Sequence, residues 1–332
     1  MNKKCIVLLS GGLDSILVVK LMLDQGIEVQ ALTFSAKLCM CGSKNTGKSA
    51  AVEAAEMLGV PLEIVDFTPD FMEIIKNPRY GHGANMNPCI DCKIYMQSRA
   101  RGMLDKFGAS FIVTGEVLGE RPMSQRKDAL LLIEKRAGVK GILLRPLSAK
   151  LLEPTIPEKE GIVDREKLLD ISGRSRKPQM ELAAKLGIKK YPQPAGGCLL
   201  TDEVFARRVK EAMAEGEFEM ENVAILSVGR QFRLAKGARL IVGRDEKENE
   251  LIDSLSRPGD IFIKMAKIQG PLSLLRGSVE EPVIEMAAAI AAHHTKSKGE
   301  DRVSVNVWKK GGERSIVTVT PIKREEMEKL RI

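Results

Sequence analysis

A glycine- and serine-rich stretch near the start of the chain has residue types suited to holding a nucleotide. A short apolar run is followed by Ser10-Gly11-Gly12-Leu13-Asp14-Ser15 and then by apolar residues at helical spacing. Two glycines let the backbone approach an anion closely, and the free N–H groups at a helix start attract phosphate. Ser10 and Ser15 add hydroxyl donors, and Asp14 can bind Mg²⁺. We therefore predict a phosphate-binding loop, with a simple capped turn as the alternative.

A second stretch fits a different phosphate-binding pattern. The residues Gly42-Ser43-Lys44-Asn45-Thr46-Gly47-Lys48-Ser49 match the G-x-x-x-x-G-K-[ST] pattern of P-loop NTPases, and a predicted helix follows. Such a loop should begin directly at a strand end, but residues 35–41 separate it from the strand predicted to end at Phe34. We therefore interpret the match as accidental. The alternative, a P-loop NTPase that uses Lys48, would release ADP rather than AMP.

Three cysteines are spaced for metal or sulfur chemistry. Cys89 and Cys92 form a C-x-x-C pair beside a predicted helix start, and Cys198 lies in a glycine-rich segment. This spacing lets two sulfurs reach one metal or each other, and a helix start lowers the pKa of a thiol. Three interpretations stay open. They are a [4Fe-4S] cluster with three protein ligands, a persulfide-carrying cysteine with a resolving partner, and structural zinc completed by Cys39 or Cys41.

Composition narrows the class of protein. With 44% hydrophobic and 29% charged residues, the 332-residue chain can build real cores, so a wholly disordered chain is excluded. The apolar runs are too short for a bilayer span or a secretion signal, so we expect a cytoplasmic protein without a membrane partner. The net charge of +8 favours a polyanionic partner. Six cysteines in a chain without a signal indicate metal or sulfur chemistry rather than disulfides.

Strand and helix patterns alternate over the first part of the chain. We predict strands at 5–9, 27–34, 61–67 and 110–114, and helices at 15–25, 49–58, 92–107, 164–171 and 177–186. This alternation implies βαβ units, and therefore a parallel sheet with helices on both faces. Such sheets bind ligands beyond the carboxyl ends of their strands. We expect Phe34, Phe67 and Thr114 to point toward the site, and the backbone near Thr33 and Phe34 to receive adenine.

The composition changes in the last third of the chain. After a predicted helix at 203–213 and an acidic stretch, strand patterns at 239–243, 260–265 and 302–308 indicate a smaller α+β domain. We predict a catalytic domain at 1–200, a helix and acidic linker at 201–221, and an RNA-binding domain at 222–332. The last segment has 20 basic and 15 acidic residues. Its densest basic cluster is either a solvated face or a nucleic-acid footprint, and consists of Arg230, Arg233, Lys236, Arg239 and Arg244.

The first 200 residues resemble the ATP pyrophosphatase, or PP-loop, superfamily, whose domains have an adenine nucleotide alpha hydrolase-like fold. The loop at 10–15 carries this resemblance together with Thr114-Gly115-Glu116-Val117-Leu118-Gly119-Glu120-Arg121-Pro122-Met123-Ser124-Gln125. The second segment is similar to the T-G-E-x-L-G-Q-x-x-S-Q motif of tRNA 4-thiouridine synthetases, except that Glu120 stands where the family usually has Gln. The resemblance implies that Gly115, Ser124 and Gln125 help to place ATP or the activated base.

Two further resemblances concern sulfur and RNA. Cys89, Cys92 and Cys198 look like the cysteine triad of iron–sulfur tRNA thiolases, which include 2-thiouridine enzymes. Residues 237–250 with 258–262 resemble the RNA-binding domain of NFACT-type proteins.

Together the resemblances imply an ATP-dependent tRNA sulfurtransferase with Mg²⁺ and a [4Fe-4S] cluster. Asp14 and the three cysteines would be catalytic, and sulfide or a persulfide carrier would be the sulfur donor. Such an enzyme adenylates a uridine carbonyl oxygen and replaces it with sulfur, at position 2 or 4 of the ring. A persulfide-based thiolase without a cluster, an adenylating C–N ligase of the same superfamily and a non-catalytic RNA-binding protein are the alternatives.

Overall fold

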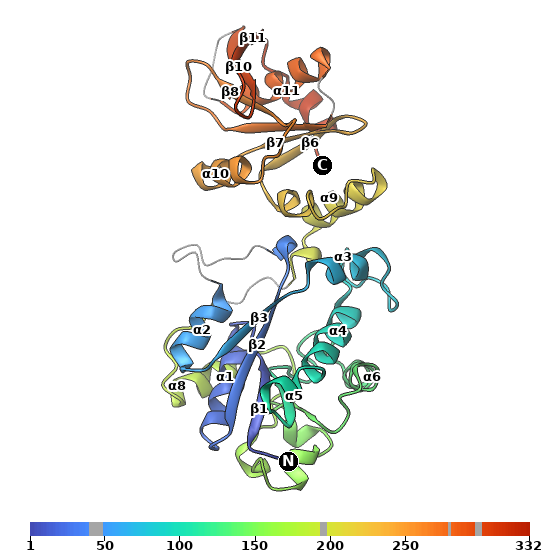
Figure 1. Cartoon of the computed structure of the whole chain (residues 1–332), viewed down its shortest axis with the longest axis vertical. Coiled ribbons are helices and arrows are strands. Elements are labelled where there is room, and N and C mark those ends of the chain that lie inside the picture. Colours follow the sequence, from blue (N-terminus) through green and yellow to red (C-terminus); the bar gives the residue numbers. More distant parts are fainter. Residues whose placement is uncertain (40–48, 193–197, 278–279, 296–300) are drawn as a thin grey trace. The chain divides into compact units, whose positions relative to one another are not determined.

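The computed structural model describes residues 1–39, 49–192, 198–277, 280–295 and 301–332. The chain divides into two compact units, Met1–Thr201 and Asp202–Ile332 (Figure 1). Each unit has its own sheet and its own hydrophobic core. In the described part of the chain, no helix combines the length and apolarity that a bilayer crossing requires.

A five-stranded parallel sheet lies at the centre of the first unit, in the order β3-β2-β1-β4-β5. Its strands are β1 (Lys4–Leu8), β2 (Glu28–Ser35), β3 (Leu62–Asp66), β4 (Phe111–Thr114) and β5 (Leu143–Leu144). Strand β1 is central because its side chains are apolar on both faces, and Cys5, Ile6 and Val7 are all fully buried. The predicted α/β class with a parallel sheet is confirmed.

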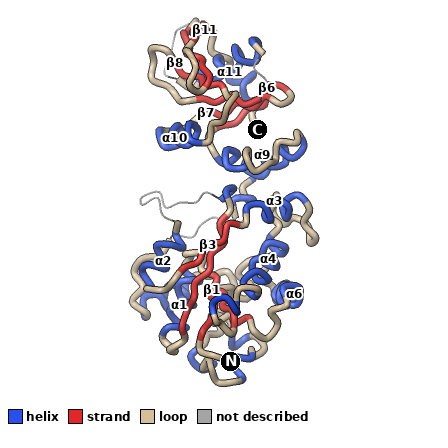
Figure 2. Tube along the Cα trace, viewed as in Figure 1, coloured by secondary structure: helices blue, strands red, loops and turns tan. Residues whose placement is uncertain are grey.

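Helices cover both faces of this sheet (Figure 2). They are α1 (Leu13–Leu23), α2 (Ala50–Leu58), α3 (Thr68–Lys76), α4 (Cys89–Arg101), α5 (Leu104–Phe107), α6 (Lys127–Ala137), α7 (Ile156–Lys159) and α8 (Lys177–Lys185). Helices α1, α2 and α8 share a core with Cys5 and Val7, while α4, α5 and α6 pack with Ile6 on the other face. The alternation of inward residues along β1 thus sorts the helices into two layers.

Two predicted helices differ in the structure. The helix predicted at 92–107 begins earlier, at Cys89, and is divided into α4 and α5 at Gly102, a residue with low helix propensity. The helix predicted at 164–171 is wrong, since only a 3₁₀ turn forms at Arg165–Lys167. Beyond this turn, the Leu169 and Ile171 N–H groups donate to the carbonyl oxygens of residues 146 and 147 at 2.9 and 2.8 Å. These long-range bonds replace the local ones of a helix.

The second unit is an antiparallel six-stranded sheet, ordered β11-β10-β8-β9-β7-β6. Its elements are α9 (Glu203–Ala214), β6 (Arg230–Ala235), β7 (Ala238–Val242), α10 (Glu246–Ser254), β8 (Ile261–Met265), β9 (Ser273–Gly277), α11 (Glu281–His293), β10 (Val303–Lys309), β11 (Ser315–Val319) and α12 (Arg324–Lys329). Helix α11 packs on one face of the sheet and α10 on the other. The α+β class is therefore also confirmed, and residues 202–221 lie inside this unit.

Candidate nucleotide and thiol site

A cavity of about 270 Å³ opens at the carboxyl edge of the parallel sheet. Eight of the ten predicted nucleotide-site residues line it, namely Ser10, Gly12, Asp14, Ser15, Thr33, Phe34, Gly115 and Gln125. Gly11 and Ser124 are not part of this lining. Thr114, predicted to point toward the site, is also part of the lining, whereas Phe67 packs against Phe34 with ring centroids 5.7 Å apart. The end of β1, the end of β2 and the segment after β4 therefore converge where the sheet topology requires.

The loop at residues 10–15 presents hydrogen-bond donors to this cavity. Gly12 is the N-cap of α1 and supplies no side-chain cap, so the first N–H groups of the helix remain available for an anion. The Ser15 hydroxyl donates to the Gly12 carbonyl at 2.8 Å and lies 3.2 Å from the Ser10 hydroxyl. The geometry is that of a phosphate-binding loop followed by an eleven-residue helix.

Two glycines of the site are required by close backbone packing. Gly11 has φ of +80°, and a Cβ atom there would lie 2.2 Å from the backbone of Ala50 at the start of α2. A Cβ atom on Gly115 would lie 2.7 Å from the backbone at Asp14 and Ser15. Gly115 thus brings the segment after β4 against the phosphate loop, a packing role that the motif alone does not disclose.

Asp14 faces the cavity with an unsatisfied oxygen. Its Oδ1 atom is buried and has no hydrogen-bond partner. Burial raises the pKa of Asp14, and the nearby cations of Arg176 and Arg121 offset only part of this increase. Glu120 lines the same cavity, and burial followed by the negative charge of Asp14 raises its pKa. An orphaned carboxylate oxygen beside a phosphate loop fits a Mg²⁺ ion, which binds through one or two carboxylates and substrate phosphates.

A buried carboxylate that sequence reasoning missed lies at the back of the cavity. Glu116 forms ion pairs with Lys93 and with Arg145 Nε, the latter at 2.9 Å. Burial alone would raise the pKa of Glu116, but the two cations outweigh it and lower the pKa to about 2. Gln97 Nε2 and the Thr114 hydroxyl also donate to this carboxylate, at 3.4 and 3.2 Å. The network fixes α4 to the segment that follows β4.

The spacing of residues along α4 is a sequence pattern from which Lys93 and Gln97 could have been predicted to lie at the site. Lys93, Met96 and Gln97 line the cavity and recur at the three- and four-residue spacing of one helical face. Cys89 lies one turn before Lys93 on the same face. Because this face is polar, it is not recognised by apolar periodicity.

The two thiols of the C-x-x-C pair lie in the first turn of α4, next to the second motif. The Cys89 thiol donates to the Ser124 hydroxyl at 3.1 Å, and Ser124 is fully buried. Burial and then the charges of the neighbouring Cys89 and Cys198 thiols together raise the pKa of the Cys92 thiol to about 12. Three thiols from two distant parts of the sequence are therefore electrostatic neighbours.

Hydrogen bonds hold the Cys198 segment beside the pair. The Met86 N–H donates to the Leu200 carbonyl at 3.1 Å, and the Asn85 side chain donates to the Thr201 carbonyl at 2.8 Å. The Thr201 N–H and hydroxyl in turn donate to the Cys198 carbonyl at 2.8 and 2.6 Å. Asn85 has φ of +58°, a conformation that Asn tolerates better than most residues. Hydrogen bonds therefore hold residues 85–86, shortly before Cys89, beside residues 200–201, shortly after Cys198.

The donor set of three thiols fits an iron–sulfur cluster or a persulfide pair. Within residues 1–39, 49–192, 198–277, 280–295 and 301–332, no three His, Cys, Asp or Glu side chains are already arranged to hold a metal ion.

Cys39 lies at the end of a 3₁₀ turn, Lys37–Cys39, while Cys41 and residues 42–48 of the P-loop-like stretch lie outside the described residues. Ser49 caps α2 by accepting from the Val52 N–H at 3.4 Å.

Residues next to the thiols or to their contacts in the sequence line the cavity. Ser124 contacts the Cys89 thiol, and the next residue, Gln125, lines the cavity. Cys92 is followed directly by Lys93, which lines the cavity from α4. The Cys89 and Cys92 thiols therefore lie next to residues that line the cavity. Ser124, which we expect to place ATP or the base, contacts the Cys89 thiol.

Comparison with known sequences agrees with this geometry. Residues 1–176, more than half of the chain, match the family model described as thiamine biosynthesis protein (ThiI). The chain belongs to the ThiI family. Residues 229–331 match the model of the NFACT protein RNA binding domain.

Individual relatives match stretches of 121 and 243 residues. A tRNA-specific 2-thiouridylase MnmA from Syntrophotalea carbinolica is 31% identical over 121 residues, which cover 34% of each chain. MnmA 2 from Thermoanaerobacter sp. is 26% identical over 243 residues, covering 65% of this chain and 62% of its own length. The chain therefore spans between about a third and three fifths of the length of these relatives. The U34-tRNA thiolase NcsA from Methanococcus maripaludis, solved with its [4Fe-4S] cluster, is 18% identical, with a TM-score of 0.33 and coverage of 67% of this chain and 70% of its own.

Proposed function

We propose that this ThiI-family protein is an ATP-dependent tRNA sulfurtransferase that converts a uridine carbonyl into a thiocarbonyl. The observation that carries the proposal is that Cys89 and Cys92 lie next to the nucleotide cavity, through residues 92–93 and 124–125, and that Cys198 is an electrostatic neighbour of Cys92. The family match and the tRNA thiouridylases among the relatives support the same substrate class. Neither an adenylating C–N ligase nor a non-catalytic RNA-binding protein would need thiols at this place.

The first step forms a bond between the uridine carbonyl oxygen and the α-phosphorus of ATP, and the bond to pyrophosphate breaks. The N–H groups at the start of α1 and the hydroxyls of Ser10 and Ser15 would hold the phosphates. Asp14, through its orphaned Oδ1, would hold Mg²⁺. Adenine would lie toward Thr33 and Phe34, at the end of β2. The products of this step are pyrophosphate and an adenylated uridine.

The second step replaces oxygen by sulfur. A sulfur nucleophile attacks the activated ring carbon, and AMP departs with the former carbonyl oxygen and the electron pair of the broken C–O bond. Cys89, Cys92 and Cys198 would hold a [4Fe-4S] cluster. When bound, such a cluster would supply sulfur in deprotonated form at neutral pH.

A second candidate chemistry uses the same thiols without a cluster. The Cys89 thiol already has a hydrogen-bond partner in Ser124, so it could carry a persulfide while Cys92 or Cys198 resolves it. Iron content separates the two versions. Anaerobically purified protein should contain about four irons per chain in the cluster version. In the persulfide version, a persulfide carrier transfers its outer sulfur to the Cys89 thiol and leaves as a thiol. Thiolation by iron-free protein supplied with such a carrier, but not with sulfide alone, would support this version.

The proposal is tested with the full chain, ATP, Mg²⁺, sulfide and an unmodified tRNA transcript. We expect AMP, pyrophosphate and thiouridine in equal amounts, measured by mass spectrometry of nucleotides and of digested tRNA. Asp14→Asn should reduce all three by about 100-fold or more, because Mg²⁺ loses its charged ligand. Asp24→Asn, which alters an exposed ion pair with Lys20 at the other end of α1, is the matched control. Release of ADP would instead support the P-loop alternative at Lys48.

The finer assignments belong to the same proposal. Comparing 2-thiouridine with 4-thiouridine in the digest identifies the ring position. Supplying sulfide or a persulfide carrier identifies the donor. We place the reaction in the cytoplasm, with the second unit contributing to tRNA binding.

A further inference from the structure

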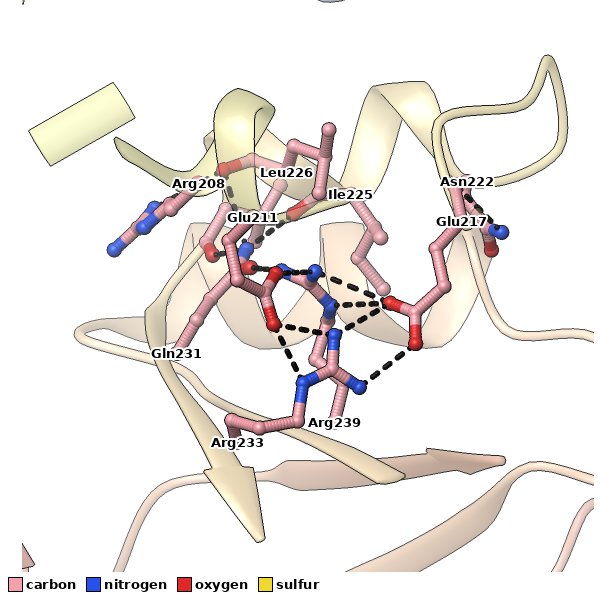
Figure 3. Close-up of polar contacts among 10 residues, drawn as sticks. Arg208, Glu211, Glu217, Asn222, Ile225, Leu226, Gln231, Arg233 and Arg239 are labelled. Carbon is pink, nitrogen blue, oxygen red and sulfur yellow. Dashed lines mark hydrogen bonds and ion pairs between the residues drawn. The ribbon is translucent and has the colours of Figure 1, made fainter. Parts of the chain in front are cut away.

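The arginines of the second unit form two groups with opposite surroundings. In the first group, Arg233 and Arg239 point toward Glu211 and Glu217 (Figure 3). Arg233 donates to Glu211 at 2.5 Å and to both oxygens of Glu217 at 2.7 and 2.8 Å. Arg239 pairs with the same two glutamates and donates to Gln231 at 2.8 Å. Their charge is neutralised inside the unit, and Arg239 is only 3% exposed.

This network corrects the interpretation of the basic cluster. Arg233 and Arg239 belong neither to a solvated face nor to a nucleic-acid footprint, because each is held by two carboxylates. Their partners come from α9 and from the acidic stretch predicted to be a linker. The acidic stretch is therefore an internal counterion for β6 and β7 rather than a spacer.

The second group contains Arg208 and Arg230, which are anchored to main-chain carbonyls instead. Arg208, on α9, is 7% exposed and donates to the carbonyls of Leu226 and Gly229 at 3.1 and 2.9 Å. Its Nε atom is buried and has no hydrogen-bond partner. Arg230, the first residue of β6, donates to the Gly243 carbonyl at 3.3 Å. Within the described residues, no carboxylate forms an ion pair with either side chain.

Two exposed arginines complete the second group. Arg244 follows β7 directly after Gly243, whose carbonyl binds Arg230. Arg331 lies on a terminal segment that pairs with β6, where the Ile332 N–H donates to the Gln231 carbonyl at 3.0 Å. We call Arg208, Arg230, Arg244 and Arg331 the arginine cluster. All four lie around the end of the sheet where β6 begins and β7 ends.

The members of the cluster lie near enough to one another for their positive charges to repel. Burial and then the charges of Arg244, Arg239 and Arg331 lower the pKa of Arg208 to about 10. Burial and then Arg244 and Arg331 lower the pKa of Arg230. The only carboxylates paired with the cluster in the described part of the chain are Glu248, on Arg244, and Glu328, on Arg331. Four cations therefore face two anions.

A histidine extends the same surface. His294, the C-cap of α11, lies against the Phe232 ring with centroids 6.0 Å apart. Burial, followed by Arg230 and His293, lowers the pKa of His294 to about 4, so the ring is neutral at pH 7. Its Nε2 atom is buried without a partner. The cluster therefore has more positive than negative charge. Two buried nitrogen atoms beside it, Arg208 Nε and His294 Nε2, have no hydrogen-bond partner.

We propose that Arg230, Arg244 and Arg331 of the arginine cluster bind the phosphodiester backbone of RNA, and that the buried Arg208 and His294 lie behind them. Guanidinium groups recognise phosphate oxygens through two parallel hydrogen bonds. Arg230 is half-buried and is held by the Gly243 carbonyl, so its guanidinium is already positioned beside the exposed Arg244. An anion at this place also relieves the mutual repulsion of the cluster. The match of residues 229–331 to an RNA binding domain model supports RNA over an acidic protein. Only the choice of tRNA as the RNA rests on the proposed function.

The test compares binding of fluorescent tRNA to full-length variants over a series of KCl concentrations. Arg230→Gln, Arg244→Gln and Arg331→Gln should each weaken binding about tenfold and reduce the slope of log K against log salt by about 1. Arg302→Gln and Arg324→Gln change exposed arginines of the same unit outside the cluster and should leave both quantities unchanged. Unchanged affinity and slope in Arg230→Gln and Arg331→Gln would overturn the proposal.

Competition distinguishes the sources of the anion. At constant ionic strength, unlabelled RNA should displace the probe, whereas millimolar inorganic phosphate or polyglutamate should not. Displacement by either of the latter two would show a site for free anions or acidic proteins, contrary to the proposal. Trp308, the only tryptophan of the chain, lies in this unit and reports its folding in every variant.

The result is independent of the thiolation proposal. Cys198→Ser should lose thiolation while its RNA affinity stays unchanged. Arg230→Gln should lose RNA affinity while it still binds ATP with normal affinity. Failure of one proposal therefore leaves a different pattern from failure of the other.

Discussion

The two units place buried charge in similar ways but with opposite signs. In the first unit, Glu116 neutralises Lys93 and Arg145, while Asp14 keeps an oxygen without a partner beside the phosphate loop. In the second unit, Glu211 and Glu217 neutralise two arginines, while the arginine cluster keeps a surplus of positive charge. Neutralised groups hold each fold together. In the functions proposed above, the groups that are not fully neutralised bind ligands of opposite sign, which are a cation with its nucleotide in the first unit and a polyanion in the second.

The largest expected effect concerns the thiols, which distinguish the first unit chemically from the second. Cys198→Ser should abolish thiouridine formation, because a hydroxyl replaces one of the three sulfur donors next to the cavity. Mass spectrometry of digested tRNA measures the loss. Cys5→Ala is the control, since Cys5 is buried in β1 away from the site and its variant should still thiolate. Retained thiolation in Cys198→Ser would show that two thiols suffice.

The next effect tests whether Glu116 is structural. Glu116→Gln should destabilise the first unit by about 3 kcal/mol at pH 7, because two buried cations lose their counterion. Hydrogen exchange of α4 and β4 peptides measures this unit by itself. Glu63→Gln, which alters an exposed pair with Lys106, should change little.

The pH dependence of stability tests the same assignment of Glu116. The pKa of Glu116 is lowered from 4.5 to about 2 in the folded protein, so its contribution is present above pH 4.5 and is lost as the pH falls toward 2. The difference in exchange between wild type and Glu116→Gln should therefore shrink across this interval. A difference that is constant from pH 6 to pH 3 would contradict the assigned charge.

A comparable effect is expected in the second unit. Arg239→Gln should destabilise it by about 3 kcal/mol, since Glu211 and Glu217 lose a buried partner. Unfolding followed by Trp308 fluorescence reports this unit, where Trp308 stacks on Phe262. Arg302→Gln should stay within about 0.5 kcal/mol of wild type. Equal stability of the two variants would mean that the network is not structural.

The smallest effect concerns the fastening of Cys198. Asn85→Ala removes a hydrogen bond to Thr201 and leaves an unfavourable positive φ, at a cost of about 1 kcal/mol. Bifunctional alkylation should then bridge Cys198 to the α4 thiols less efficiently, as seen by peptide mass spectrometry. Asn85→Gly keeps the backbone conformation and should lose less. Equal cross-linking in wild type, Asn85→Ala and Asn85→Gly would show that Asn85 does not position Cys198.

The sequence allowed the local parts of this architecture to be predicted. The strand–loop–helix unit around Ser10 to Ser15 and the carboxyl-edge position of Phe34 follow from short-range patterns and sheet topology. The role of Gly115 could not be predicted, because its close approach to Asp14 depends on how β4 lies beside β1.

Ion pairs between residues that are distant in the sequence also could not be predicted from the sequence. The five basic residues between 226 and 244 looked alike in sequence, yet Arg233 and Arg230 have opposite surroundings. Their difference depends on glutamates from α9 and the stretch after it, and therefore on packing rather than on spacing. Lys93 and Glu116 were missed for the same reason, since the pair joins a helix to a segment 23 residues away.

The central claim is that ATP removes the uridine oxygen at a site where sulfur then replaces it. Transcripts labelled with ¹⁸O at one uracil carbonyl test it directly, with AMP collected after a single turnover with sulfide. The account predicts that ¹⁸O from the thiolated position appears in the phosphate of AMP, in an amount equal to the thiouridine formed. Unlabelled AMP beside thiouridine would contradict it.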